Sequence, residues 1–398
     1  MHLPIFFFRL LLVVVPALLL PALSSCGSDH DDDRDEENRR TLFVYMPWST
    51  DLLSCFETNL SDFEAAIEQQ KGLKSQRVIV YLARSKTQAS MFEIACDGGQ
   101  CTRRQLKEYS GTGYTTLQGL TAILADVKTY APATLSYSMI IGCHGLGWVP
   151  VKALAQSRAV RGRVALHWNR GNQATRLFGG RTSDCQTDIE TLRESMEAAD
   201  FHTEYILFDD CYMSGIEVAY ELRHVTRRLI ASTSEMMMYG IPYKLVGGNL
   251  LGTPDYSALC RNFLAFYSSY STPSGTLTVT DCSKLDSLAL AVARLNLRSD
   301  HAPVCPDSLQ RLGGYTPGIF FDMQSYLRHL CPNPQLRAEA DSLLHAAVEH
   351  TVHTPTIFTT QISSIAIREF SGLTISEPSL HPFASQYYSE TSWFKDTH

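Results

Sequence analysis

The sequence predicts an α/β fold in which helices cover both faces of a mostly parallel sheet. Short apolar segments that suit buried strands alternate with segments whose apolar residues recur at helical spacing. Such alternation is typical of parallel strands joined by covering helices. The chain has 398 residues, 44% of them hydrophobic and 19% charged, which allows a substantial core. The formal net charge of −7 offers no basic surface for nucleic acid, so we expect no such partner.

The N-terminal residues 1–25 are expected to be a lipoprotein signal peptide and not part of the fold. Arg9 precedes an apolar run, 10–20, that is too short and too interrupted by proline for a good membrane span. The following Leu-Ser-Ser-Cys26 resembles a bacterial lipobox, although an ordinary signal peptide with a chance cysteine would look the same. Residues 26–40 are strongly acidic and should form a solvated tether. We therefore expect an exported chain, lipidated at Cys26 and anchored to the outer membrane or cell surface of a Gram-negative bacterium.

The folded part is expected at 41–398, as one domain without internal repeats. The predicted strands are 42–46, 77–82, 90–95, 104–109, 138–143, 205–208, 228–232, 277–280 and 372–375. The predicted helices are 60–70, 115–130, 255–270, 283–298, 336–350 and one that begins at a capping box at 187–190. Residues 149–181 break the alternation with a long basic segment that lies between two polar strand ends. A loop of this length is usually functional or disordered, so it either covers a site or is a solvated surface loop.

Those two strand ends carry the candidate chemistry. His144 directly follows the strand at 138–143, and Asp209, Asp210 and Cys211 directly follow the strand at 205–208. The carboxyl ends of core strands are where open α/β sheets place their active sites. A cysteine and a histidine there would form a nucleophile and a base if the fold brings the two strands together.

Cys211 is the candidate nucleophile, although a lone buried cysteine is usually a small hydrophobe. Its position before a helix, with Ser214 as a candidate cap, would favour a reactive thiolate. Asp209 and Asp210 act against this, because neighbouring negative charge disfavours the thiolate. Side chains alternate along a strand, so Asp209 should share a side with Cys211 while Asp210 points away. Asp209 is therefore a candidate for binding a cationic substrate group.

His144 is the candidate base. An isolated histidine in an apolar context is more often a satisfied core residue, but the cysteine at the other strand end favours a catalytic pair. Gly145 lets the backbone come close to a ligand. The backbone N–H groups of Gly145 and Cys211 are the candidate donors for an oxyanion.

The remaining motifs exclude other chemistries. The 11 cysteines have no framework spacing, and Cys96 and Cys101, which could be cross-linked across a hairpin, are expected to stay reduced. His345, His350 and His353 lack the glutamate of a zincin and are expected on or after a polar helix face. Phosphate-binding, dinucleotide-binding and serine-hydrolase motifs are absent from the sequence. The sequence therefore requires no metal and no cofactor.

The two strand ends, in this order, resemble the caspase–gingipain–clostripain group of cysteine peptidases, and the clostripain family in particular. HGLGW at 144–148 is similar to the His-Gly-x-Gly-Trp of that family, and FDDCYMSGIEVAYEL resembles its nucleophile segment. Further similar blocks follow in order: TRLFGG with TDIETLRESM, SEMMMYGIPY, LTVTDCSKLDSLA, and GLTISEP with SETSWF. The likeness covers most of residues 41–398.

The resemblance implies a caspase-like α/β/α sandwich with a Cys–His dyad. His144 would be the general acid/base and Cys211 the nucleophile, and Asp209, two residues before the cysteine, would line an S1 pocket for Arg or Lys. Two residues depart from the family pattern: Asp210 stands where a small residue is more usual, and Cys143 directly precedes the histidine. Either could change the reactivity of the thiol.

Processing and calcium are further implications of the resemblance. Such enzymes are often made as precursors that are cut between the His and Cys strands, which suits the basic segment 149–181, with Lys152 or Arg158 as the candidate position. Calcium dependence occurs in the family, although no acidic cluster of this sequence indicates a calcium site.

The sequence thus predicts a lipid-anchored, monomeric cysteine endopeptidase that cleaves protein or peptide substrates after basic residues. One alternative is a surface-anchored binding protein that keeps the fold without turnover. Another is an acyltransferase or ligase that uses the same dyad.

Overall fold

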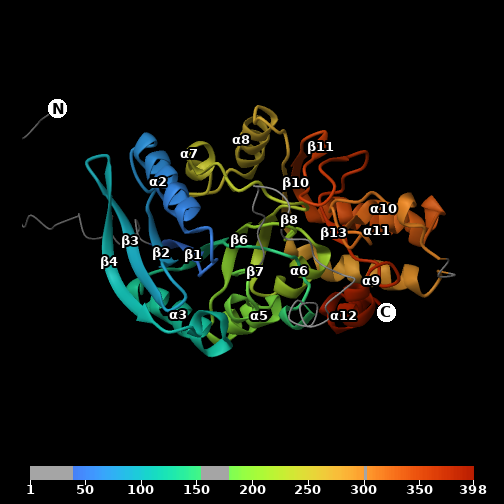
Figure 1. Cartoon of the computed structure of the whole chain (residues 1–398), viewed down its shortest axis with the longest axis horizontal. Helices are drawn as coiled ribbons and strands as arrows, with labels where there is room; N and C mark the ends of the chain where they lie inside the picture. The colour runs from blue at the N-terminus through green and yellow to red at the C-terminus, as the bar shows by residue number, and fades with distance from the viewer. Residues whose placement is uncertain (1–38, 154–178, 300–302) are drawn as a thin grey trace, which may run out of the picture.

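A nine-stranded sheet forms the centre of the computed structural model, which describes residues 39–153, 179–299 and 303–398 (Figure 1). The signal peptide, Cys26, almost all of the acidic tether and Arg158 lie outside the described residues. In spatial order the strands are β10 (Val348–His353), β8 (Thr276–Asp281), β7 (Thr226–Ala231), β6 (Thr203–Asp209), β5 (Ser136–Gly142), β1 (Arg40–Met46), β2 (Gln76–Ala83), β3 (Gln88–Asp97) and β4 (Gln100–Ser110).

The five central strands, β7, β6, β5, β1 and β2, run parallel to one another. Antiparallel pairings occur toward both edges, where β8 pairs with β7 and β10, and β3 pairs with β2 and β4. The central strands are almost entirely buried, which explains their continuous apolar sequences, because parallel strands are covered on both faces. The predicted mostly parallel sheet is confirmed.

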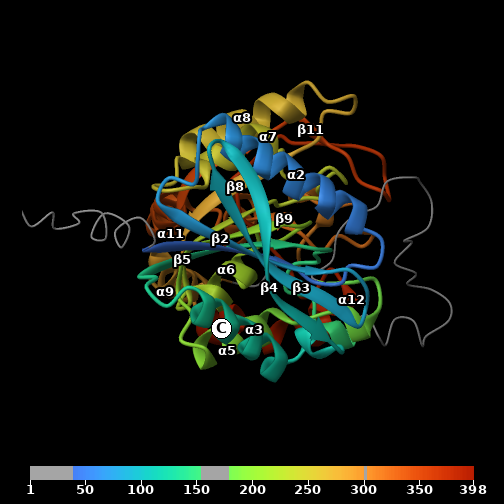
Figure 2. The same cartoon turned by 90° about the vertical axis from the view of Figure 1, so that its left-hand side faces the viewer.

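Helices form a layer on each face of this sheet (Figures 1 and 2). One layer consists of α2 (Leu53–Gln69), α7 (Tyr243–Val246) and α8 (Tyr256–Ser268). The other consists of α3 (Leu117–Tyr130), α5 (Ile189–Ala198), α6 (Ile216–Leu222), α9 (Leu285–Asn296) and α13 (Ser392–Thr397), with α11 (Pro334–Ala347) packed against α9. The fold is therefore the expected α/β/α sandwich.

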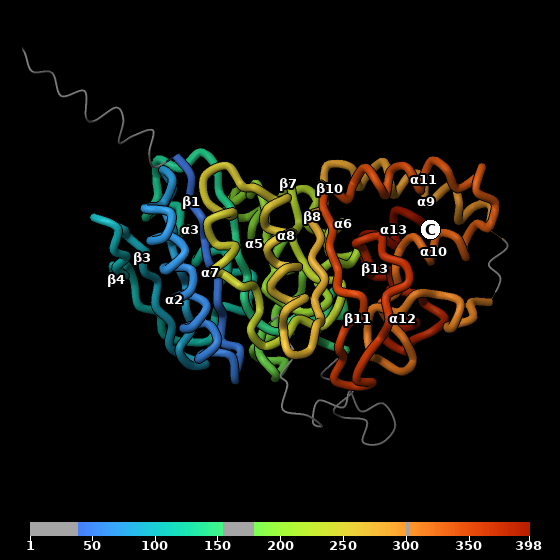
Figure 3. The backbone as a smooth tube through the Cα atoms, turned by 90° about the horizontal axis from the view of Figure 1, so that it is seen from above, coloured from blue at the N-terminus to red at the C-terminus, as the bar shows by residue number. Residues whose placement is uncertain are grey.

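The other C-terminal elements form an extension at one end of the sandwich, beside β10 and α6 (Figure 3). It contains α10 (Met323–Leu330), α12 (Pro382–Tyr387) and two small sheets: β9 (Phe321–Asp322) with β13 (Thr374–Ile375), and β11 (Thr356–Ile357) with β12 (Ile365–Ala366). The segment predicted as a strand at 372–375 thus pairs with β9 and not with the main sheet.

Two local predictions were wrong. The helix predicted at 336–350 ends earlier, because α11 stops at Ala347 and the β-branched residues that follow pair with β8. His345 lies on α11, and His350 and His353 follow it on β10, which agrees with the expectation that they lie on or after a helix. Cys96 and Cys101 form a disulfide, although we expected them to stay reduced. They are directly opposite one another in the β3–β4 hairpin with their Cα atoms 4.1 Å apart, which brings the two sulfurs within bonding reach.

A buried carboxyl on α6 links the sandwich to the C-terminal extension. Glu217 Oε1 accepts a hydrogen bond of 2.8 Å from the backbone N–H of Ser376. The Ser376 hydroxyl accepts one of 2.8 Å from the Trp148 indole and donates to the carbonyl of Ile319. This network joins α6, the segment after His144 and the extension at one serine.

Glu217 is expected to make the protein less stable as the pH rises. Burial raises the pKa of Glu217 to about 7, whereas a carboxyl in the unfolded chain titrates near 4.5. The native state therefore holds the proton more tightly, so this contribution is complete below pH 4.5 and is lost between pH 4.5 and 7. The loss is on the order of 3 kcal/mol.

Glu217→Gln keeps the acceptor for Ser376 and removes the titration. Its unfolding free energy, measured by urea denaturation, should rise relative to the wild type between pH 5 and pH 8. Glu190→Gln, an exposed carboxyl on α5, should leave the pH dependence unchanged. If the unfolding free energies of the wild type and Glu217→Gln changed in parallel with pH, the prediction would be contradicted.

Candidate active site

The structure brings the two polar strand ends into direct contact. Strands β5 and β6 are neighbours, with Gly142 opposite Asp209, so His144 and Cys211 follow at the same edge of the sheet. The backbone of Gly145 packs directly on the turn that holds Cys211. A Cβ atom at Gly145 would lie 2.5 Å from the Cys211 carbonyl oxygen, so only glycine allows this approach.

The Cys211 sulfur is buried and receives a hydrogen bond of 3.1 Å from the backbone N–H of Met236, which lies in the loop after β7. The predicted contribution of a helix N-terminus is wrong, because α6 begins only at Ile216. Ser214 does not cap it either, since its hydroxyl donates to the carbonyl of Gly372. The N–H of Met236 therefore makes a polar contact of the kind that we had assigned to the helix.

Asp210 and Cys143, the two departures from the family pattern, are partners of each other. Asp210 Oδ1 accepts a hydrogen bond of 2.7 Å from the Cys143 backbone N–H. The Cys143 thiol donates to Asp210 Oδ2 at 3.3 Å. The Asp210 carboxylate thus joins the ends of β5 and β6, whereas the sulfur of Cys211 contacts the loop after β7. This agrees with the predicted alternation of side chains.

Asp209 lies beneath the same loop as Cys211. Its Oδ1 accepts a hydrogen bond of 2.9 Å from the Ile241 backbone N–H. Its Oδ2 accepts from the Asn59 amide at 3.2 Å and from the Tyr243 hydroxyl at 3.3 Å. The Asp209 carboxylate has no exposed surface in this conformation, so a cationic group would reach it only if the covering side chains moved.

His144 is held by a carboxylate that the sequence analysis missed. Its Nε2 lies 2.8 Å from Asp51 Oδ1, and Asp51 Oδ2 accepts a hydrogen bond of 3.1 Å from Arg181. Partial burial favours the protonated form of Asp51, but the hydrogen bond and charge of His144, and then the charge of Arg181, outweigh it and lower the pKa of Asp51. An ionised carboxylate at this position orients the imidazole and stabilises its protonated form.

The strand-end rule that selected His144 could also have selected Asp51. Strand β1 pairs with β5 and ends at Met46, and the polar residues Ser49, Thr50 and Asp51 follow shortly after it. The signal was therefore present, although weaker, because Pro47 and Trp48 separate the strand from its polar residues.

The described ends of the basic segment lie close to His144. The backbone N–H of His144 donates to the carbonyl of Gly179 at 3.1 Å. Gly179 has φ +110°, and a Cβ atom there would lie 2.3 Å from the carbonyl oxygen of Cys185, so only glycine suits this position. Arg181 then reaches Asp51, so the chain returning to the sandwich packs on the candidate base.

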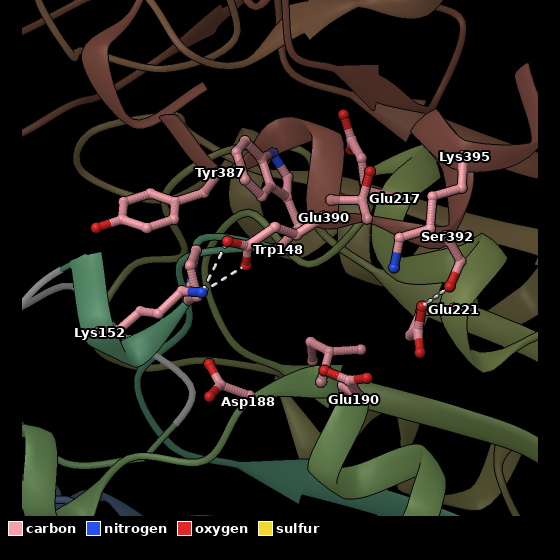
Figure 4. A pocket seen from close by; sticks show the side chains of 13 residues that line it. Trp148, Lys152, Asp188, Glu190, Glu217, Glu221, Tyr387, Glu390, Ser392 and Lys395 are labelled. Carbon is pink, nitrogen blue, oxygen red and sulfur yellow. Dashed lines mark hydrogen bonds and ion pairs between the residues drawn. The ribbon is translucent and has the colours of Figure 1, made fainter. Parts of the chain in front are cut away.

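The candidate processing residue Lys152 is docked on the C-terminal extension (Figure 4). Its ammonium contacts both carboxylate oxygens of Glu390, at 2.8 and 2.6 Å, and lies 5.1 Å from the centre of the Tyr387 ring. Residues 151–153 form a helical turn in which the N–H of Ala153 donates to the carbonyl of Pro150, and Ala153 is buried. Cleavage after Lys152 therefore requires this turn to open.

A cavity of about 180 Å³ adjoins Lys152, with several carboxylates among its lining residues (Figure 4). One of them, Asp188, accepts a hydrogen bond of 2.8 Å from the backbone N–H of Val151. The capping box predicted at 187–190 would use Thr187 as its cap, but the N-cap residue of α5 is Asp188, which makes no side-chain cap hydrogen bond, so that prediction was wrong. The Asp188 side chain instead anchors the segment that follows His144.

Within the described ranges, no group of three or more His, Cys, Asp or Glu residues could hold a metal ion. No helix in the same ranges is sufficiently long and apolar to cross a membrane.

Comparison with known proteins decides the family. A sequence model of the clostripain family, peptidase family C11, matches residues 44–301. The chain belongs to the clostripain family. It is accordingly a cysteine protease, as the resemblance implied, and the expected caspase-like architecture is confirmed.

Solved structures agree with this assignment. The chain is 44% identical to a secreted C11 cysteine protease from Bacteroides thetaiotaomicron, iotapain; the match covers 90% of this chain and 99% of that one, with a TM-score of 0.83. It is 48% identical to a clostripain from B. thetaiotaomicron ATCC 29148 in complex with the peptide inhibitor BTN-VLTK-AOMK, over 56% of this chain and 99% of that one, with a TM-score of 0.54.

More distant matches show the fold alone. An inactive zymogen of a C11 protease from Parabacteroides distasonis is 23% identical, over 91% of this chain and 98% of that one, with a TM-score of 0.76. No curated protein matches the chain.

Proposed function

We propose that this protease is an endopeptidase that cleaves proteins or peptides after Arg or Lys, with Cys211 as nucleophile and His144 as general acid/base. The observation that carries the proposal is the packing of Gly145 on the Cys211 carbonyl, which brings the two strand ends together. Asp209, two residues before Cys211 and beneath the same loop, supplies the negative charge for a basic side chain. A clostripain relative binds a peptide inhibitor with the sequence VLTK, which supports a basic preference.

The mechanism follows from these positions. The Cys211 thiolate attacks the carbonyl carbon of the scissile bond, and the N–H groups of Gly145 and Cys211 are the candidate donors to the resulting oxyanion. His144, oriented by Asp51, protonates the leaving amine, and a thioester remains on Cys211. Water then attacks the thioester with His144 as base, which releases the new carboxyl end and returns the thiol.

The protein is proposed to be made as a precursor and to cut itself after Lys152 or Arg158. The docked helical turn at Lys152 and the contact between Gly179 and His144 suit an uncut form, because they belong to the two described ends of the basic segment. Export has support from the secreted relative iotapain. We further propose that Cys26 carries the lipid anchor and that the protease is a monomer.

Hydrolysis of fluorogenic peptides by the mature wild-type protein tests the proposal. Peptides that differ only in P1, as Arg, Lys or norleucine, should give kcat/KM values at least about 100-fold higher for the basic residues. A denaturing gel of the same samples reports whether the chain is cut. Parallel assays with added calcium and with a chelator determine whether the metal is needed. Failure of a cut, folded protein on all three peptides would contradict the proposal.

A further inference from the structure

Glu235 is a buried carboxyl that none of the catalytic assignments uses. Only 3% of the residue is exposed, and it lies in the loop after β7. Its Oε1 accepts hydrogen bonds from the Tyr212 hydroxyl at 2.9 Å and the Thr360 hydroxyl at 3.3 Å. Its Oε2 accepts one of 3.0 Å from the backbone N–H of Thr360. Burial raises the pKa of Glu235 to about 7, so a carboxyl here carries a desolvation cost that a neutral side chain would avoid.

The loop that carries Glu235 runs alongside the nucleophile turn. The backbone N–H of Tyr212 donates to the carbonyl of Ser234 at 3.0 Å, and that of Ser214 donates to Ser232 at 2.9 Å. Met236, directly after Glu235, donates its N–H to the Cys211 sulfur. The two segments are thus joined at three points by backbone groups, one of which bonds the reactive atom itself.

The side chain of Glu235 makes a further contact with this turn, through the Tyr212 hydroxyl. Tyr212, directly after Cys211, has φ +62°, a left-handed conformation that is unfavourable for a tyrosine. Its ring stacks on that of Phe320, with the ring centroids 4.6 Å apart and an interplanar angle of 15°, and its hydroxyl donates to Glu235. Such a conformation persists only where the surroundings hold it, and here the ring and the hydroxyl are both held.

We propose that Glu235 is a positioning residue for the nucleophile, which fixes the Tyr212 hydroxyl and thereby the turn that presents the Cys211 sulfur to the Met236 N–H. This inference rests on the proposed role of Cys211. Glu235 acts through Tyr212 and Met236 and does not touch the reacting bond. Its loss should therefore slow the chemical step and leave substrate binding largely intact.

The test compares Glu235→Ala, Glu235→Gln and Tyr212→Phe with the wild type. Glu235→Ala should lower kcat at least tenfold with KM changed less than threefold, and Tyr212→Phe should lower kcat at least threefold. Glu235→Gln should recover most of the rate, because its amide can donate to a reoriented Tyr212 hydroxyl while its oxygen accepts from Thr360. The rate of Cys211 alkylation by iodoacetamide, followed by mass spectrometry, should fall in the same order.

Glu217→Ala is the matched control, since it removes a second buried carboxyl whose pKa burial raises to about 7, and it should leave kcat within threefold. Unchanged kcat and alkylation in Tyr212→Phe would overturn the proposal even if Glu235→Ala fails to fold. A rise in KM alone would also overturn it, because Glu235 would then act in substrate binding. A wild type without turnover would refute the proposed function separately, and alkylation would still report on Glu235.

Discussion

Cys211→Ala is expected to lower peptide hydrolysis by at least about 10⁴-fold and to leave the chain uncut between His144 and Cys211. In the proposed mechanism the sulfur forms the covalent intermediate, and an alanine methyl group cannot replace it. The adjacent thiol of Cys143 is directed to Asp210, so it does not offer a second nucleophile at the same place. The substitution removes one hydrogen-bond acceptor for Met236, so circular dichroism should confirm that the variant is folded.

Cys260→Ala provides the matched control for this experiment. Cys260 is a buried thiol on α8, and burial raises its pKa to about 12, so it is inert at neutral pH. Its replacement should leave the peptidase rate unchanged. Hydrolysis by Cys211→Ala would contradict the assignment of the nucleophile. A cut chain in both the wild type and Cys211→Ala would show that another protease processes the precursor.

The position of processing can be read from the same gels. Lys152→Ala and Arg158→Ala each remove one candidate residue, and the variant that stays uncut identifies it. The docking of Lys152 on Glu390 makes a further comparison useful. This ion pair is half exposed and therefore weak, so Glu390→Gln should alter the rate of processing and not its position.

Sequence reasoning placed His144 and Cys211 directly after two buried strands, and these strands are neighbours in the sheet. Parallel strands that are neighbours end at the same edge, and polar residues directly after two buried strands are visible in a single sequence. The central strands were found for the same reason, since strands covered on both faces have continuous apolar runs. The layered architecture followed from their alternation with helices.

The missed features depend on long-range contacts that leave little local pattern. The strand-end signal of Asp51 is weak until β1 is known to pair with β5, and Glu235 is identified only when the loop after β7 is known to lie beside Tyr212. The start of α6 was misplaced because the polar residues after Cys211 suit either a helical cap or an extended turn. Asp188 is a residue type favoured at helix caps, but its side chain accepts a hydrogen bond from the backbone N–H of Val151, 37 residues earlier in the chain.

Asp209→Asn is expected to lower kcat/KM for peptides with Arg or Lys at P1 by about 10²- to 10³-fold and to change hydrolysis of the norleucine peptide little. The substitution keeps the size of the side chain and removes the negative charge that would pair with a substrate cation. Its oxygen can still accept from Ile241, and its new amide can donate to the Tyr243 hydroxyl and, once the Asn59 amide turns over, to the Asn59 oxygen. The fold should therefore survive, and the loss should appear as lost discrimination between basic and neutral P1.

Asp62→Asn separates this effect from a general disturbance of the covering loop. Asp62 lies on α2 and accepts a hydrogen bond of 2.6 Å from the Tyr239 hydroxyl, so it holds the same loop without lying at the end of β6. If Asp209 is the specificity charge, Asp62→Asn should alter basic and neutral peptides equally. An equal loss on all peptides in Asp209→Asn would instead make Asp209 a support for the loop at 236–243. The source of the basic preference would then have to be another carboxylate close to Cys211.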